Sequence, residues 1–275
     1  MQPLVRAAGV RPADLLEIAD RAAAAGARVA ADWLDRTASL RIEEKAGPGD
    51  LVSQADREAE QAVRDVLAAA RPDDAVLGEE SGATGGTSGI TWAVDPVDGT
   101  TNYLYGRPDW AVSVAALAED GRVLAGVVAE PSLGRTTRAC AGGGTEADGA
   151  PVPRLRQDDL VRALVEVNLG RPQQKGAAGG LLDVLVPCVR DVRRGGSAAV
   201  GLAQVATGRV DAAWVPGLQP WDCAAGVLLV LEAGGTVGDL SGPSGGRVPA
   251  SGDVLAAPPA LWEPLRRLLM PVYAG

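Results

Sequence analysis

The chain has 275 residues, of which 47% are hydrophobic and 22% charged, a composition typical of globular proteins and unlike that of disordered or collagen-like chains. Its formal net charge of −9 disfavours a general nucleic-acid surface, which requires clustered Lys and Arg. The sequence contains no histidine, which excludes Ser-His-Asp triads, phosphohistidine chemistry and His-ligated zinc, so any catalysis must use carboxylates, hydroxyls or metal ions.

The sequence also gives an expectation for the cellular compartment. No run approaches the roughly 20 uninterrupted apolar residues that a membrane span requires, and the N-terminus lacks a signal-peptide pattern. Cys140, Cys188 and Cys223 are odd in number and widely spaced, which indicates reduced thiols rather than a disulfide framework. We therefore expect a cytoplasmic protein with no membrane segment.

Apolar periodicity predicts interleaved helices and strands, and hence an α/β (α+β) protein. Two helices come first, at residues 12–36 and 53–70, with Ser53 as N-cap of the second and Asp56 in its first turn. Short β-type runs, separated by Gly- or Pro-containing turns, follow at residues 75–77, 91–94, 110–117 and 123–129. The second half is expected to alternate between strands at 164–168, 210–214, near 237 and at 254–256, and helices at 181–190, 197–207, 221–233 and from 259 onward.

The Gly- and Pro-rich stretch at residues 142–153 is the best candidate for a seam between two lobes. We expect an N-terminal α+β lobe, residues 1–150, that carries most of the acidic site residues. A C-terminal α/β lobe, residues 151–275, would carry Asp222 and further contacts to a ligand. A site made of residues from both lobes would then lie in the crevice between them.

Acidic residues cluster at the end of one predicted strand, within residues 92–102. Asp95 and Asp98 flank a Pro-fixed turn, where their carboxylates and the Val97 carbonyl can converge as the hard oxygen ligands that Mg²⁺ prefers. Gly99 allows close backbone approach, and the amides beyond Asp98 could bind an anion. The competing interpretation is an ordinary turn, because Asp-Pro and Asp-Gly are common turn formers.

Two further acids strengthen the metal-site interpretation. Glu79, in Gly78-Glu79-Glu80, also follows a short apolar strand, and Asp222 opens an apolar helical run after Trp221. Singly, Glu79 could be a solvated loop acid and Asp222 an N-cap. Together with the acids of residues 92–102 they supply one cluster.

These segments resemble the inositol monophosphatase family of Mg²⁺-dependent, typically lithium-sensitive phosphatases. The resemblance keeps the family's order from residue 45 to residue 257. It implies a layered αβαβα sandwich, hydrolysis of a phosphate monoester and a homodimer. The similar segments are 78–80, 92–103, 221–226 and 232–235, supported by Lys45 and residues 50–56, 196–199 and 205–209.

The resemblance implies two or three Mg²⁺ ions and assigns a role to each matching residue. The implied metal ligands are Glu79, Asp95 and the Val97 carbonyl for the first ion, Asp95, Asp98 and Asp222 for the second, and Asp56 with Glu79 for a third, weaker ion. The implied catalytic residues are Glu79, Thr100 and Asp56, which activate a water. The implied substrate contacts are Asp98, Gly99, Thr100, Gly196, Ser197, Ala198, Val215 and Asp222. Lys45 is similar to a family lysine near the mouth of the site.

The chemistry implied by this resemblance needs no histidine. A phosphate monoester carries about two negative charges, which clustered Mg²⁺ ions can neutralise while they activate the attacking water. Glu79 and Thr100 could accept that water's proton, so no protein nucleophile is required. The resemblance implies a small phosphorylated polyol as substrate, with inositol 1-phosphate first.

One position departs from the family pattern and keeps the substrate open. Val215 stands seven residues before Asp222, where animal and bacterial inositol phosphatases carry a glutamate that contacts inositol hydroxyls. Loss of such a polar contact costs about 1 to 3 kcal/mol. A sugar phosphate or histidinol phosphate is therefore an alternative substrate, and a Val that merely packs, with inositol still accepted, is the other interpretation. Tyr105 replaces a common family histidine at a peripheral position.

Competing phosphatase and hydrolase motifs are weak. Residues 188–194 fit C-x5-R but contain no glycine to wrap amides around a phosphate. Residues 242–246 fit G-x-S-x-G without any histidine base and read as a surface turn. A haloacid-dehalogenase-type enzyme would need D-x-D, whereas Asp95 and Asp98 are spaced D-x-x-D. A non-catalytic binding protein on the same fold is the remaining alternative.

Overall fold

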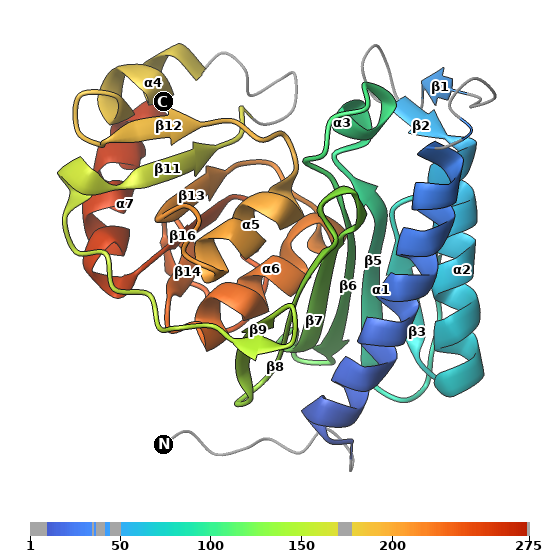
Figure 1. Ribbon diagram of the computed structural model, residues 1–275. Coiled ribbons are helices and arrows are strands. Elements are labelled where there is room, and N and C mark those ends of the chain that lie inside the picture. Colours follow the sequence, from blue (N-terminus) through green and yellow to red (C-terminus); the bar gives the residue numbers. More distant parts are fainter. Residues whose placement is uncertain (1–9, 35, 37–41, 45–50, 170–177, 274–275) are drawn as a thin grey trace.

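The computed structural model describes residues 10–34, 36, 42–44, 51–169 and 178–273, and Lys45 lies outside them. Helices and sheets alternate in five layers: α1 with α2, an eight-stranded sheet, α5 with α6, a six-stranded sheet, and α4 with α7 (Figure 1). The predicted layered αβαβα sandwich is confirmed. Within the part of the chain described, no helix is both long and apolar enough to cross a membrane.

The eight-stranded sheet has the order β10-β9-β8-β7-β6-β5-β3-β4 and is antiparallel except where β3 runs parallel to β5. Along its central strands, successive apolar side chains point to opposite faces of the sheet. One face packs on α1 and α2 and the other on α5 and α6. The strands are β3 (Ala75–Gly78), β4 (Gly82–Thr84), β5 (Ile90–Asp98), β6 (Ala111–Ala118), β7 (Val123–Glu130), β8 (Arg135–Cys140), β9 (Gly144–Ala147) and β10 (Ala150–Pro151).

The outer helix layer beside the eight-stranded sheet consists of α1 (Pro12–Leu34) and α2 (Gln54–Ala70), which pack closely on each other. Gly26 permits this approach, because a Cβ there would lie only 2.7 Å from Val63. The hydroxyl of Tyr103 donates to the Ala30 carbonyl at 2.7 Å and ties α1 to α3 (Thr100–Leu104). A two-stranded sheet of β1 (Ile42–Glu44) and β2 (Leu51–Ser53) precedes α2.

The six-stranded sheet has the order β12-β11-β13-β16-β14-β15. It mixes parallel pairing of β11 with β12 and β13 and antiparallel pairing of the remaining strands. Its strands are β11 (Leu164–Val167), β12 (Asp191–Arg193), β13 (Ala212–Val215), β14 (Thr236–Asp239), β15 (Gly242–Pro243) and β16 (Val254–Ala257), and its helices are α4 (Ala178–Leu185), α5 (Ala198–Ala206), α6 (Pro220–Glu232) and α7 (Pro259–Tyr273).

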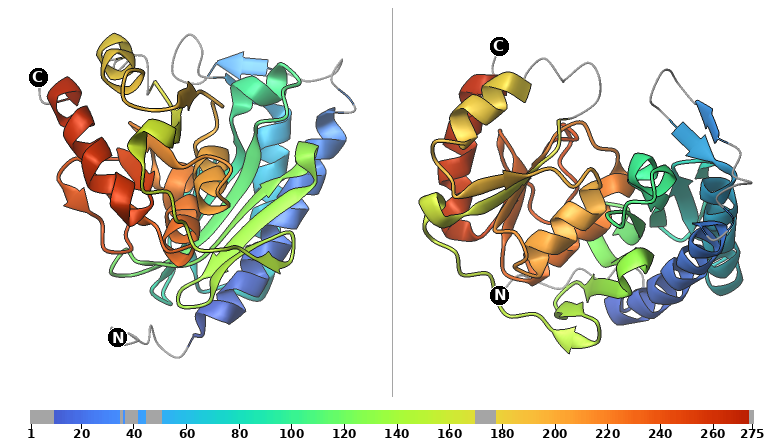
Figure 2. Two further views of the ribbon diagram at one scale, coloured as in Figure 1. Left: turned by 60° about the vertical axis from the view of Figure 1, so that its left-hand side comes forward. Right: turned by 45° about the horizontal axis from the view of Figure 1, so that its top comes forward.

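Helices α5 and α6 fill the space between the two sheets (Figures 1 and 2). Two glycines make this central layer thin. A Cβ on Gly126 of β7 would lie 2.8 Å from the Cα of Ala225, and a Cβ on Gly226 would lie 2.4 Å from the Cβ of Leu202 in α5. The central helices therefore pack almost backbone to backbone on their neighbours, which holds the N-terminus of α6 firmly beside the first sheet.

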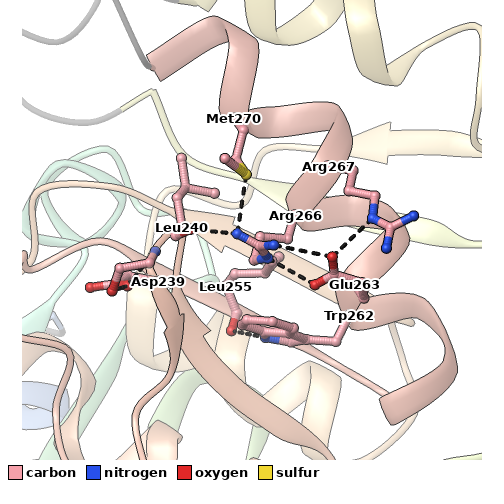
Figure 3. Close-up of polar contacts among 9 residues, drawn as sticks. Asp239, Leu240, Leu255, Trp262, Glu263, Arg266, Arg267 and Met270 are labelled. Atoms are coloured by element: carbon pink, nitrogen blue, oxygen red, sulfur yellow. Dashed lines mark hydrogen bonds and ion pairs between the residues drawn. The ribbon is translucent and has the colours of Figure 1, made fainter.

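The last helix, α7, is fixed to the second sheet by side chains shown in Figure 3. The indole of Trp262 donates to the Leu255 carbonyl at 3.1 Å, and Arg266 donates to the Leu240 carbonyl at 2.8 Å. Glu263 pairs with Arg266 at 2.8 Å, on the solvent side. These contacts anchor the outermost layer.

Most predicted elements agree with the structure, and the differences have physical causes. The helix predicted for 181–190 ends at Leu185, because Pro187 cannot donate a backbone hydrogen bond and disfavours helical geometry at Val186. The segment 142–153 is not an irregular connection, since it contributes β9 and the edge strand β10 to the first sheet. The lobe division at residue 150 stays a prediction.

Candidate active site

The first two acids lie at the end of β5, and the strand continues through both of them instead of ending in a turn. The pairing with β6 joins Asp95 to Ser113 and Asp98 to Ala111, so β5 carries one extra residue there. Such a bulge redirects side chains at a strand end. Asp95 is 1% exposed and accepts a hydrogen bond from the amide of Val97 at 3.0 Å, which holds both acids on a fixed backbone.

Glu79 is brought to Asp95 by sheet topology. Strands β3 and β5 are parallel and pair Gly78 with Val94, so their carboxyl ends meet at one edge of the sheet. The amide of Glu79 donates to the Val94 carbonyl at 3.1 Å. The strand-end glutamate therefore lies beside the strand-end aspartates, as the sequence analysis predicted.

Asp222 reaches the same place from the other half of the chain. It is the third residue of α6, and its carboxylate caps the helix by accepting from the Gln219 amide at 2.7 Å. Ser113 of β6 donates to the Trp221 carbonyl at 3.1 Å and docks this helix end on the first sheet. The N-cap interpretation of Asp222 is wrong in its position, because Gln219 is the N-cap and Asp222 is the third helical residue of a capping box. This capping role is compatible with a place in the cluster.

The three carboxylates converge. One oxygen each from Glu79, Asp95 and Asp222 lies within 4.8 Å of the other two. Burial, followed by the charges of Glu79, Asp98 and Asp222, raises the pKa of Asp95 well above its ordinary value, and burial with the Asp222 charge raises the pKa of Asp98 to about 7. Mutually repelling carboxylates with only hard oxygen donors suit Mg²⁺. The residues present therefore fit that ion.

Asp98 also connects the two halves of the chain. It accepts from the Ser197 hydroxyl and, at 2.6 Å, from the Ala199 amide at the start of α5. Ser197 is the N-cap of that helix and accepts from the Val200 amide at 3.1 Å. Gly99 has φ 93°, and a Cβ there would lie 3.1 Å from Ser197, so only glycine lets these segments approach.

Thr100 and Asp56 lie at the edge of this cluster. The Thr100 hydroxyl is 3.3 Å from Oδ1 of Asp56 and 3.2 Å from the Val97 carbonyl oxygen, and its single proton can be donated to either one. Asp56 is 1% exposed in the first turn of α2. The structure thus brings together a hydroxyl and an acid to which the resemblance gives roles in activating water.

The remaining predicted site residues have mixed positions. Gly196 has φ 96° and precedes α5, where Ala198 is 3% exposed. Val215 is 1% exposed and belongs to the apolar cluster around α5 and α6, so its contact with a substrate stays a prediction.

Sequence reasoning missed Asn102, whose side-chain amide donates to the carbonyls of Asp109 at 2.6 Å and Gly195 at 2.8 Å. It thereby links the loop before α5 to the first sheet. Its place inside the segment 92–102 was the only available signal, because backbone partners 7 and 93 residues away leave no local pattern.

Comparison with known proteins decides the family. The profile of the inositol monophosphatase family matches residues 12–271. The chain belongs to this family. As a member it is a phosphoric monoester hydrolase, which confirms the resemblance drawn from the sequence and the enzyme class it implied.

Individual relatives agree with the family assignment. An inositol-1-monophosphatase of Mycobacterium leprae is 42% identical over 236 residues, which cover 82% of this chain and 79% of the relative. The crystal structure of the extragenic suppressor protein SuhB from Bartonella henselae superimposes with a TM-score of 0.88 at 34% identity, covering 93% of this chain and 98% of that one. An inositol monophosphatase structure from Anabaena gives a TM-score of 0.81 at 32% identity, covering 94% of this chain and 96% of that one.

Proposed function

We propose that this family member hydrolyses the phosphate monoester of a small polyol in a Mg²⁺-dependent reaction, with inositol 1-phosphate as the leading substrate. The observation that carries the proposal is the convergence within 4.8 Å of Glu79, Asp95 and Asp222, which come from the turn after β3, from β5 and from α6. The names of the relatives support the substrate class.

In this proposal each acid has a place in metal binding. Glu79, Asp95 and the Val97 carbonyl would hold one ion, Asp95, Asp98 and Asp222 a second, and Asp56 with Glu79 a third. Bound Mg²⁺ supplies positive charge that neutralises the phosphoryl oxygens and makes water more acidic. The number of ions is a further part of the proposal.

The chain's own residues orient water and substrate. The Thr100 hydroxyl, between Asp56 and the Val97 carbonyl, can accept a hydrogen bond from the attacking water while donating to one of these oxygens. Glu79 is the general base that takes the water's proton. Backbone amides of Gly99 and of the segment 196–198 at the start of α5 would bind phosphate oxygens.

The substrate's identity is tested by measuring phosphate release from inositol 1-phosphate, histidinol phosphate, a sugar phosphate and a nucleotide, each with Mg²⁺ or EDTA. We expect release from the inositol ester only with Mg²⁺. Release from no monoester in the presence of Mg²⁺ would refute the proposed function. Preference for histidinol phosphate or a sugar phosphate would change the proposed substrate but leave the proposed hydrolysis of a phosphate monoester unchanged.

Val215 gives this panel a direct comparison. If the apolar residue marks a substrate other than inositol, Val215→Glu should shift preference toward the inositol ester. If Val215 only packs, its replacement buries a carboxylate in the apolar cluster and lowers the melting temperature without changing preference.

We further propose a cytoplasmic homodimer. The three free cysteines support a reducing compartment, and the family resemblance supports the dimer. Sedimentation of the purified protein at micromolar concentration tests the oligomeric state.

A further inference from the structure

A buried glutamate outside the acidic cluster holds the backbone around Glu79. Glu60, in the second turn of α2, is 0% exposed. Its carboxylate accepts from the amide of Glu80 at 2.7 Å and from the amide of Ser81 at 3.0 Å. One side chain therefore satisfies the two consecutive amides that follow Glu79.

The other side of the same turn is held by Arg64, one helical turn further along α2. Its Nε pairs with Glu60 at 2.8 Å, and its Nη2 donates to the Gly82 carbonyl at 2.6 Å. Glu60 and Arg64 thus fix both the amides and the carbonyl of residues 80–82. Because the Arg64 side chain is only 12% exposed, this pair is poorly screened by solvent.

Gly78 completes the arrangement. A Cβ at this position would lie 2.6 Å from the carboxyl atoms of Glu60, so any side chain would push the carboxylate away from the turn. Glycine is therefore required for close approach here, although its backbone is ordinary β-strand. Gly78 and Glu60 together constrain the backbone on both sides of Glu79.

We propose that Glu60 is a positioning residue that fixes the carboxylate of Glu79 for Mg²⁺ binding. The amide of Glu79 is bonded to Val94 and the next two amides to Glu60, so three successive backbone donors have fixed directions. A metal-binding carboxylate attached to such a fixed backbone loses little conformational entropy when it binds an ion. The inference rests on the proposed function, since it assigns Glu79 to the metal site.

A purely structural role is the competing explanation, and the chain offers a matched control. Glu232, at the end of α6, accepts from the amides of Gly142 at 2.8 Å and Gly144 at 2.9 Å. It performs the same task for the turn between β8 and β9, which contains none of the proposed site residues. Any general cost of losing a turn-holding carboxylate should therefore be common to both glutamates.

The test compares Glu60→Gln with Glu232→Gln in the full chain. Glutamine keeps the size but offers one acceptor oxygen, and its NH₂ group faces the second backbone amide as donor against donor. We expect both variants to melt at lower temperature. Only Glu60→Gln should raise the Mg²⁺ dissociation constant measured by calorimetry, and the Mg²⁺ concentration for half-maximal phosphate release, by about tenfold, or about 1.4 kcal/mol.

The outcomes separate this inference from the proposed function. If Glu60→Gln binds Mg²⁺ as the unmodified protein does, or if Glu232→Gln weakens binding equally, Glu60 is not a positioning residue and the proposed function is untouched. If the unmodified protein binds no Mg²⁺ and releases no phosphate, both fail. Should Glu60→Gln not fold, Arg64→Met must still weaken Mg²⁺ binding, by about threefold, and an unchanged constant would overturn the inference.

Discussion

The replacement Asp98→Asn should stabilise the Mg²⁺-free protein at pH 8. Asp98 is 9% exposed, and burial together with the charge of Asp222 raises its pKa to about 7 from an ordinary value of 3.8. Asparagine is isosteric, and its oxygen can still accept from the Ser197 hydroxyl and the Ala199 amide. The substitution thus removes the repelled charge while its oxygen keeps these hydrogen bonds.

The magnitude and its pH window follow from the raised pKa. Below pH 3.8 the carboxyl is protonated in both the folded and unfolded states, so it causes no penalty. Between pH 3.8 and about 7 the unfolded chain ionises first, and the free energy of unfolding falls by about 1.36 kcal/mol per pH unit. Above about pH 7 the penalty is constant at about 4 kcal/mol, an upper limit for the gain from Asp98→Asn.

Urea denaturation of both proteins in EDTA, at pH 4 and pH 8, measures this effect. We expect nearly equal stability at pH 4 and a more stable variant at pH 8. Added Mg²⁺ should reverse the order at pH 8, because only the unmodified protein keeps all the proposed ligands. A variant that is no more stable than the unmodified protein at pH 8 in EDTA would refute the reasoning.

Three further predictions concern single residues. Thr100→Val removes the hydroxyl between Asp56 and the Val97 carbonyl and should lower kcat about 100-fold while Mg²⁺ still raises the melting temperature; an unchanged kcat would exclude a role for this hydroxyl. Gly126→Ala places a Cβ 2.8 Å from a backbone atom of α6 and should cost about 1 to 3 kcal/mol in urea denaturation. By contrast, an added Cβ at Gly179 in α4 meets open space, so Gly179→Ala should raise the free energy of unfolding by up to about 1 kcal/mol. Equal effects of the two alanine substitutions would contradict the packing argument.

Much of the fold could be predicted because its long elements have strong local patterns. Helices α1, α2, α5 and α6 are amphipathic or continuously apolar over several turns, and each lies within two residues of its predicted bounds. Several short elements, such as α3, β10 and β12, were not predicted, because so few residues show little periodicity, and the six-residue strand β8 was missed as well. The position of β12, for example, depends on its parallel pairing with the more distant strand β11.

The candidate site shows the same division. Glu79, Asp95 and Asp222 were recognisable because each follows or opens an apolar element, and the structure brings them together. Glu60 carried no such signal, since Glu60 and Arg64 read as an ordinary i,i+4 pair on a helix surface. Only the fold shows that the pair faces the turn at Glu79.

The most direct test of the proposed metal site is anomalous diffraction from crystals grown with Mn²⁺ in place of Mg²⁺. We predict an anomalous peak bounded by the carboxylates of Glu79, Asp95 and Asp222, and its loss in crystals of Asp95→Asn. A peak at some other position, or a peak that persists in Asp95→Asn, would contradict the assignment of this cluster as the metal site.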